Sequence, residues 1–163
     1  MKKLIPLALA TVLCNMAFSQ LKVTPVCPPI VVNILAGNVN EIAPDFSARR
    51  VKEKLPCYTS EEPDAASSQC GEVVFYKDKD ISFYTGRGYI QIGEKFKGKL
   101  SLPLLGAARS SLFKWLGNPK IKDLNWDAFQ TEYGTLVLHY NKAGKVNLIQ
   151  FSKKSTDALS LCD

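Results

Sequence analysis

The stretch Val73-Val74-Phe75-Tyr76-Lys77-Asp78-Lys79-Asp80-Ile81-Ser82-Phe83-Tyr84 decides the expected fold. It holds two runs of β-branched and aromatic residues, separated by the polar turn 77–80, and this pattern is typical of a β-hairpin. A turn at 86–88 then leads into Tyr89-Ile90-Gln91-Ile92, which predicts a third strand. Residues 73–92 therefore predict the first part of an antiparallel sheet.

Two amphipathic helices are expected, one before each group of strands. The first spans about 46–55, with Asp45 as the N-cap and Pro56 as the residue that stops it. The second spans 107–116 and ends at Gly117, which suits the position after a helix C-terminus, with Pro119 following to prevent continuation. Each helix has one apolar face that can pack on a sheet.

Three more strands are expected at 129–133, 136–140 and 146–151. The two halves, 45–92 and 105–151, then share the order helix, loop, three strands. This order predicts an α+β domain with two short helices packed on one face of an antiparallel sheet of about six strands. A tandem repeat explains the shared order, and coincidence at a small number of positions is the alternative.

A short motif in the second half resembles a known unit. Leu116-Gly117-Asn118-Pro119, Trp126, Tyr133-Gly134 and Gly144-Lys145-Val146 resemble the repeating unit of β-lactamase-inhibitory-protein-like domains and of small lipoproteins of outer-membrane protein assembly. The resemblance covers about 105–151, with a degenerate copy at 45–92. It implies the same α+β fold and a protein that binds other proteins without catalysis. It identifies no contact residue.

Residues 1–19 have the pattern of a cleavable signal peptide. Lys2 and Lys3 precede the uncharged run 4–13, and Ala17-Phe18-Ser19 provides the small residues that signal peptidase requires. A buried N-terminal helix is the alternative. Lipoprotein anchoring at Cys14 is disfavoured by the bulky Leu13. We therefore expect residues 20–163 to form one exported domain, periplasmic or secreted, without a transmembrane segment.

Four cysteines remain after the predicted cleavage: Cys27, Cys57, Cys70 and Cys162. An even number in an oxidising compartment predicts two disulfides, and three pairings are open. We favour Cys57–Cys70, which would close the loop 58–69, together with Cys27–Cys162. The inhibitor resemblance also implies a disulfide across that loop. Zinc is disfavoured because the chain has no C-x-x-C pair and one histidine.

The charge of the chain is moderately basic. Lys and Arg number 21 against 15 acidic residues, a net charge of +6 that falls to +4 once Lys2 and Lys3 leave with the signal peptide. Lysines cluster at 95, 97 and 99, at 120 and 122, and at 153 and 154. Such clusters can meet nucleic acid or an anionic membrane. Exported proteins rarely meet nucleic acid, so we expect no nucleic-acid partner and interpret the lysines as aids to solubility.

The sequence predicts no catalytic residue, metal or cofactor. His139 is the one histidine, and Ser110 and Ser111 belong to a helix that should pack on the opposite face of the sheet. Asp78 and Asp80 lack the later ligands of a calcium loop. A small hydrolase that uses His139 is the least favoured functional class.

A protein-binding surface is the favoured interpretation. If Val73, Phe75, Ile81, Phe83, Ile90 and Ile92 face the helices, the opposite face carries Val74, Tyr76, Ser82, Tyr84, Tyr89 and Gln91, joined by Val137 and His139 from the second half. Tyrosine combines a large contact area with a polar tip, which suits protein interfaces. Cross-strand stabilisation of the sheet is the alternative role. The predicted function is an inhibitor or immunity-type protein, and the alternative is a structural accessory factor of envelope assembly.

Overall fold

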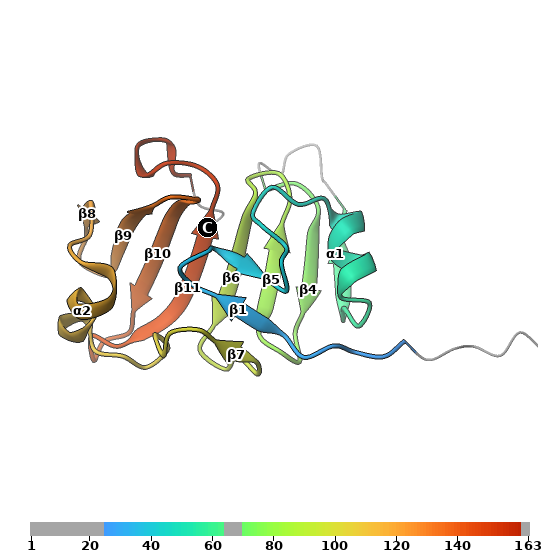
Figure 1. Ribbon diagram of the computed structural model, residues 1–163, viewed down its shortest axis with the longest axis horizontal. Coiled ribbons are helices and arrows are strands. Elements are labelled where there is room, and N and C mark those ends of the chain that lie inside the picture. The colour runs from blue at the N-terminus through green and yellow to red at the C-terminus, as the bar shows by residue number, and fades with distance from the viewer. Residues whose placement is uncertain (1–24, 64–69, 161–163) are drawn as a thin grey trace, which may run out of the picture.

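The computed structural model describes residues 25–63 and 70–160. The predicted signal peptide and Cys162 lie outside these ranges. The protein has an α+β fold in which one large sheet is covered on one face by a smaller sheet and two short helices (Figure 1). No helix among the described residues is long and apolar enough to cross a bilayer.

The main sheet has eight strands, two more than expected, in the order β3-β4-β5-β6-β11-β10-β9-β8, and every neighbouring pair is antiparallel. Its strands are β3 (Ser60–Glu62), β4 (Val73–Tyr76), β5 (Ile81–Tyr84), β6 (Tyr89–Gly93), β8 (Ile121–Lys122), β9 (Trp126–Thr131), β10 (Gly134–Tyr140) and β11 (Val146–Ser152). The halves meet at β6 and β11. Each half contributes one helix followed by four strands in matching order.

A second sheet of three strands, which the sequence did not predict, lies across the main sheet. It consists of β1 (Val31–Asn33), β2 (Asn38–Val39) and β7 (Lys99–Leu100), with β1 antiparallel to β2 and parallel to β7. Val32 and Val39 are fully buried and belong to the same apolar core as Phe83 and Phe151 of the main sheet. The small sheet therefore covers the centre of what we call the inner face.

The two helices lie on the same inner face, on either side of the small sheet (Figure 1). Helix α1 (Ala48–Lys54) is shorter than expected and is capped by the Ser47 side chain, which accepts from the Arg50 backbone N–H, so the prediction of Asp45 as N-cap is wrong. The second helix is broken into the 3-10 turn η1 (Arg109–Ser111) and α2 (Phe113–Leu116). Gly117 ends it with φ of 70°, as its position in the sequence indicated.

The pairing of β4 with β5 corrects the predicted faces of β4. Residues directly opposite on antiparallel strands share a face. Tyr76 lies opposite Ile81, and Val74 lies opposite Phe83. All four side chains are buried in the inner core. The predicted inward orientation of Val73 and Phe75 and the predicted outward orientation of Val74 and Tyr76 are therefore wrong, because the four-residue turn fixes the register the other way.

The disulfide pairing also differs from the favoured one. Cys27 is bonded to Cys57, with 5.5 Å between their Cα atoms, so both Cys57–Cys70 and Cys27–Cys162 are wrong. Cys57 follows directly after Pro56 at the end of α1, where it meets the N-terminal segment before β1. Cys70 is disulfide-bonded as well.

Candidate functional site

Five of the six predicted binding residues share the outer face of the main sheet. Tyr84 pairs with Tyr89, and Gln91 pairs with Gln150. Val137 pairs with Gln150 as well, and His139, two residues further along β10, lies on the same side. Tyr76 does not belong to this face. It is 2% exposed, points into the inner core and donates a hydrogen bond from its hydroxyl to the carbonyl of Leu55 at 2.5 Å. Burial raises the pKa of Tyr76.

Exposure divides the outer face into a covered part and an open part. The C-terminal segment, residues 153–160, crosses one end of it: the Thr135 hydroxyl donates to the carbonyl of Lys154, and the Gln130 side chain accepts from Thr156. Tyr89 and Val137 are also buried, at 1% and 0% exposed. We use the name open sheet face for the half-buried side chains that remain: Phe75, Ser82, Tyr84, Gln91, Trp126, His139 and Leu148.

A chain of hydrogen bonds crosses the open sheet face from β10 to β6. His139 Nε2 lies 2.9 Å from Gln150 Oε1, Gln150 Nε2 donates to Gln91 Oε1 at 3.1 Å, and the Tyr89 hydroxyl donates to the same oxygen at 3.2 Å. Since the Gln150 amide nitrogen already donates to Gln91, its oxygen accepts the proton on His139 Nε2. The chain holds these four side chains in fixed orientations.

Aromatic rings lie at both ends of this chain. Tyr84 stacks on Tyr89, with 4.5 Å between ring centroids and 2° between planes, and Phe75 meets Tyr84 edge to face at 6.4 Å. At the other end, the rings of Trp126 and His139 lie 6.5 Å apart. Burial raises the pKa of Tyr84. The open sheet face thus combines flat apolar area with amide groups. Two charged side chains lie at its β3–β4 edge: Glu62 shares the face through its pairing with Val73, and Lys77 Nζ lies 5.3 Å from the Phe75 ring centroid.

The position of His139 bears on the hydrolase alternative. Within the described part of the chain, its side chain is hydrogen-bonded to Gln150, an amide. Ser110 and Ser111 lie at η1 on the inner side of the sheet, the opposite side from His139. Within the described residues there is no cluster of three or more His, Cys, Asp or Glu side chains that could hold a metal ion.

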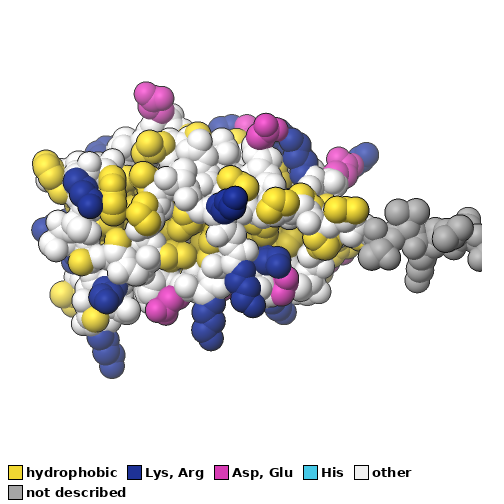
Figure 2. Space-filling view, turned by 60° about the horizontal axis from the view of Figure 1, so that its bottom comes forward, with side chains coloured by type: hydrophobic (Ala, Val, Ile, Leu, Met, Phe, Trp, Pro, Cys, Tyr) yellow, Lys and Arg dark blue, Asp and Glu magenta, His cyan; other side chains and the backbone are white. Residues whose placement is uncertain are grey.

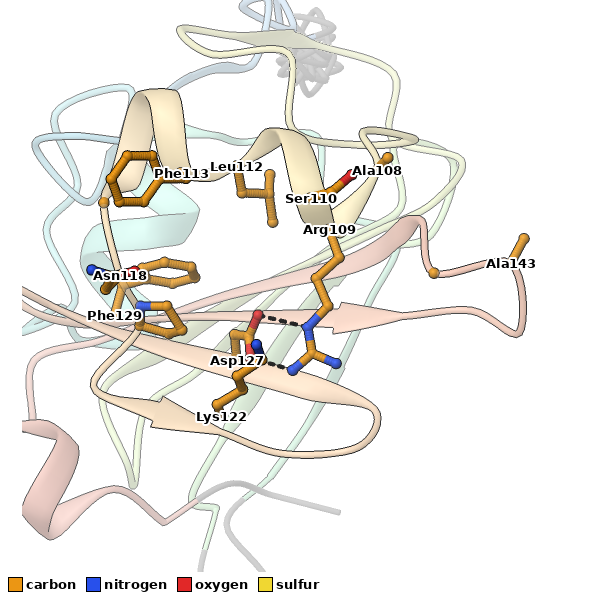
Figure 3. Close-up of a pocket in the computed structure, with 13 residues that line it drawn as sticks. Ala108, Arg109, Ser110, Leu112, Phe113, Asn118, Lys122, Asp127, Phe129 and Ala143 are labelled. Carbon is orange, nitrogen blue, oxygen red and sulfur yellow. Dashed lines mark hydrogen bonds and ion pairs between the residues drawn. The ribbon is translucent and has the colours of Figure 1, made fainter.

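A pocket of about 590 Å³ lies on the inner face at the opposite edge of the sheet from α1 (Figure 3). Leu112 and Phe113 of the second helical segment form one wall, and Phe129 of β9 forms the other, with Lys122 beside Asp127. Phe113 is 63% exposed. The pocket exists because α2 is a single turn, which is too short to cover the inner side of β8 and β9.

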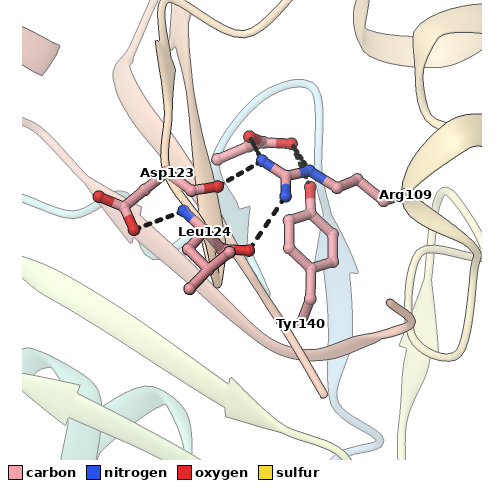
Figure 4. A network of polar contacts seen from close by, with 5 residues as sticks. Arg109, Asp123, Leu124 and Tyr140 are labelled. Carbon is pink, nitrogen blue, oxygen red and sulfur yellow. Dashed lines mark hydrogen bonds and ion pairs between the residues drawn. The ribbon is translucent and has the colours of Figure 1, made fainter. Parts of the chain in front are cut away.

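One end of the pocket is closed by a buried polar network (Figure 4). Asp127, 3% exposed, accepts from Arg109 Nε at 3.0 Å, from Arg109 Nη2 at 2.5 Å and from the Tyr140 hydroxyl at 2.6 Å. Arg109 also donates to the carbonyls of Asp123 and Leu124. The hydrogen bond to Asp127 raises the pKa of Arg109, and burial raises that of Tyr140. Because every one of these groups has a partner, the network anchors η1 to the turn between β8 and β9.

The sequence prediction missed Trp126, Leu148 and Gln150, which the structure places on the outer face. Trp126 was outside the predicted strand, which began three residues too late. Alternation along 146–151 would not have found Leu148, because the register shifts between His139 and Tyr140: Val146 lies in the inner core while Leu148, two residues later, lies opposite His139 on the outer face.

Comparison with known proteins identifies no relative: no protein-family model matches the chain, and no curated protein or solved structure matches it significantly.

Proposed function

We propose that this protein is an exported domain that binds one partner protein through the open sheet face, as an inhibitor or immunity-type protein does. The observation that carries the proposal is the hydrogen-bonded chain His139–Gln150–Gln91–Tyr89, flanked by aromatic rings at both ends. It fixes side chains that an isolated sheet surface would leave mobile.

Rigid aromatic and amide groups are what a binding surface of this kind needs. Tyrosine and tryptophan are enriched among residues that dominate binding energy, and side chains already held in place lose less conformational entropy on association. Glu62 and Lys77 lie at the β3–β4 edge of the open sheet face, so the side chains that lie across the face from Gln91 to Trp126 avoid the desolvation cost that a buried lysine or carboxylate would impose. The face therefore suits a partner that presents an apolar and neutral polar surface.

Two features support export and the tandem-repeat interpretation. The Cys27–Cys57 bond is of the kind that persists in oxidising compartments. Each half of the main sheet follows the order helix and four strands, and the halves meet at β6 and β11. This arrangement supports the resemblance to β-lactamase-inhibitory-protein-like domains, which also have tandem units.

The test is affinity capture from a native envelope fraction, followed by reconstitution of the pure complex. Trp126→Ala and Tyr84→Ala should each weaken the reconstituted complex about 30-fold, the loss expected of a residue that dominates an interface. Phe113→Ala is the matched control, because it removes an exposed aromatic ring at the pocket on the inner face.

Equal affinity of the wild type and both sheet-face variants would exclude the open sheet face. Loss of binding in Phe113→Ala alone would move the interface to the pocket beneath α2.

A further inference from the structure

The lysines of this protein differ in whether they have acidic partners. Four lysines form ion pairs with acidic residues from other segments of the chain: Lys52 with Glu61 and Glu72, Lys54 with Glu41, Lys120 with Asp157, and Lys153 with Asp45. The other lysines are concentrated at one end of the main sheet.

The sheet topology brings three basic segments to that end. Ile81 pairs with Ile92, Gly93 with Leu148, and Val146 with Tyr140, so the turn between β4 and β5, the connection from β6 to β7 and the turn between β10 and β11 all lie at the same end of the strands. We call this surface the basic end and define it by seven lysines: Lys77, Lys79, Lys95, Lys97, Lys99, Lys142 and Lys145. Figure 2 turns this end toward the viewer and shows dark-blue side chains projecting from it.

Few acidic groups neutralise the basic end. Asp78, Asp80 and Glu94 are the acidic residues in these three segments. Asp78 pairs with Lys79 at 3.3 Å, and Asp80 accepts a hydrogen bond from the backbone N–H of Lys95. In the described part of the chain, Lys95, Lys97, Lys99, Lys142 and Lys145 form no ion pair, and all five are exposed.

We infer that the basic end docks on the surface of an anionic lipid bilayer. The lysines extend over the ends of five neighbouring strands, a width of about 20 Å at the spacing of strands in a sheet, and therefore face a surface rather than a single anion. Lysine is a compact, hydrated charge that suits diffuse attraction, whereas bidentate recognition of phosphate or bases favours arginine. The one arginine near this end, Arg109, is held by Asp127.

This orientation leaves the rest of the molecule accessible. With the strand ends on the bilayer, the strands stand roughly upright and the open sheet face points sideways. The N-terminal segment also joins the domain here, because Cys27 and Lys79 line the same small cavity. The inference does not depend on the proposed protein-binding function: Lys77 touches the open sheet face through the Phe75 ring, and the variant that tests the basic end keeps Lys77.

Sedimentation with lipid vesicles tests the inference. The purified protein should bind mixed vesicles of phosphatidylglycerol and phosphatidylcholine at low salt and should lose this binding as the salt concentration rises. It should not bind vesicles of phosphatidylcholine alone. Each lysine near an anionic surface contributes about fivefold to partitioning. Replacing Lys95, Lys97, Lys99 and Lys142 by glutamine should therefore weaken binding about 600-fold, the product of four fivefold factors.

The control variant removes the same charge elsewhere, with Lys114, Lys122, Lys153 and Lys154 replaced by glutamine, and should bind within about threefold of the wild type. Circular dichroism would confirm that both variants fold. Equal losses in the two variants would overturn the inference in favour of overall charge. Binding to heparin or duplex DNA without binding to anionic vesicles would overturn it in favour of a soluble polyanion.

Discussion

Replacing Asp127 by asparagine should destabilise the second half of the sheet by about 3 kcal/mol. The buried carboxylate accepts three hydrogen bonds, two from Arg109 and one from Tyr140. An asparagine side chain has one acceptor oxygen, and its amide N–H groups would face a donor. Hydrogen bonds to a charged group contribute roughly 1.5–3 kcal/mol. The Arg109 side chain is 27% exposed, so water replaces part of the hydrogen bonding that Arg109 loses. Each of the two lost hydrogen bonds is therefore taken at the lower end of that range, about 1.5 kcal/mol, which gives about 3 kcal/mol in total.

Urea unfolding followed by tryptophan fluorescence measures this loss, provided that the slope with denaturant stays constant. Tyr140→Phe removes one of the three donors and should cost about 1.5 kcal/mol. The double variant should lose at least about 1 kcal/mol less than the two single losses added together, because both changes act on the same carboxylate. A loss below about 1 kcal/mol for Asp127→Asn, or strict additivity, would refute the anchoring role of the network.

Two further predictions concern the covalent link and the buried tyrosines. Replacing Cys27 and Cys57 by alanine opens a crosslink between positions separated by 30 residues and should lower the unfolding free energy by about 3.5 kcal/mol on the chain-entropy model; an unchanged urea midpoint would contradict it. Burial raises the pKa of Tyr76 and Tyr133 in the folded protein. The contribution of each tyrosine to the unfolding free energy is therefore complete below the unfolded-state pKa of about 10. Above that pH it falls by about 1.4 kcal/mol per pH unit for each tyrosine. Urea midpoints measured on both sides of that pH should show a smaller alkaline loss in Tyr133→Phe than in the wild type.

Local patterns were sufficient to predict the elements that the chain forms from adjacent residues. The hairpin of β4 and β5 has the predicted bounds, and Gly117 ends the second helix as expected. The α+β class followed from these elements. The small sheet could not be predicted in this way, because β1 and β7 are two or three residues long and pair across the whole first half of the chain. Hydrophobic periodicity has no signal at that length.

One error in the predicted site came from assigning the residues of β4 to the wrong faces of the sheet. The run Val73-Val74-Phe75-Tyr76 is apolar at every position, so alternation within it does not distinguish the two faces. The turn length does: four residues between Tyr76 and Ile81 place these two side chains opposite each other, and therefore on one face. Applying that constraint would have removed Tyr76 from the predicted surface and added Phe75. The disulfide failed for a different reason, since the position of Cys27 depends on the small sheet.

The buried and half-buried members of the outer face have different roles, and this difference decides which substitutions report on binding. Tyr89 is 1% exposed, supports Tyr84 by stacking and donates to Gln91. Removing its ring would create a cavity and release both neighbours, so binding and stability would fall together. Tyr84 is half-buried, and its ring forms the outer layer of the stack. Its truncation removes the stacked ring and a side-chain hydrogen bond with Tyr89, but none of the bonds that join Tyr89, Gln91, Gln150 and His139. A loss of binding at unchanged stability can then be assigned to the surface itself.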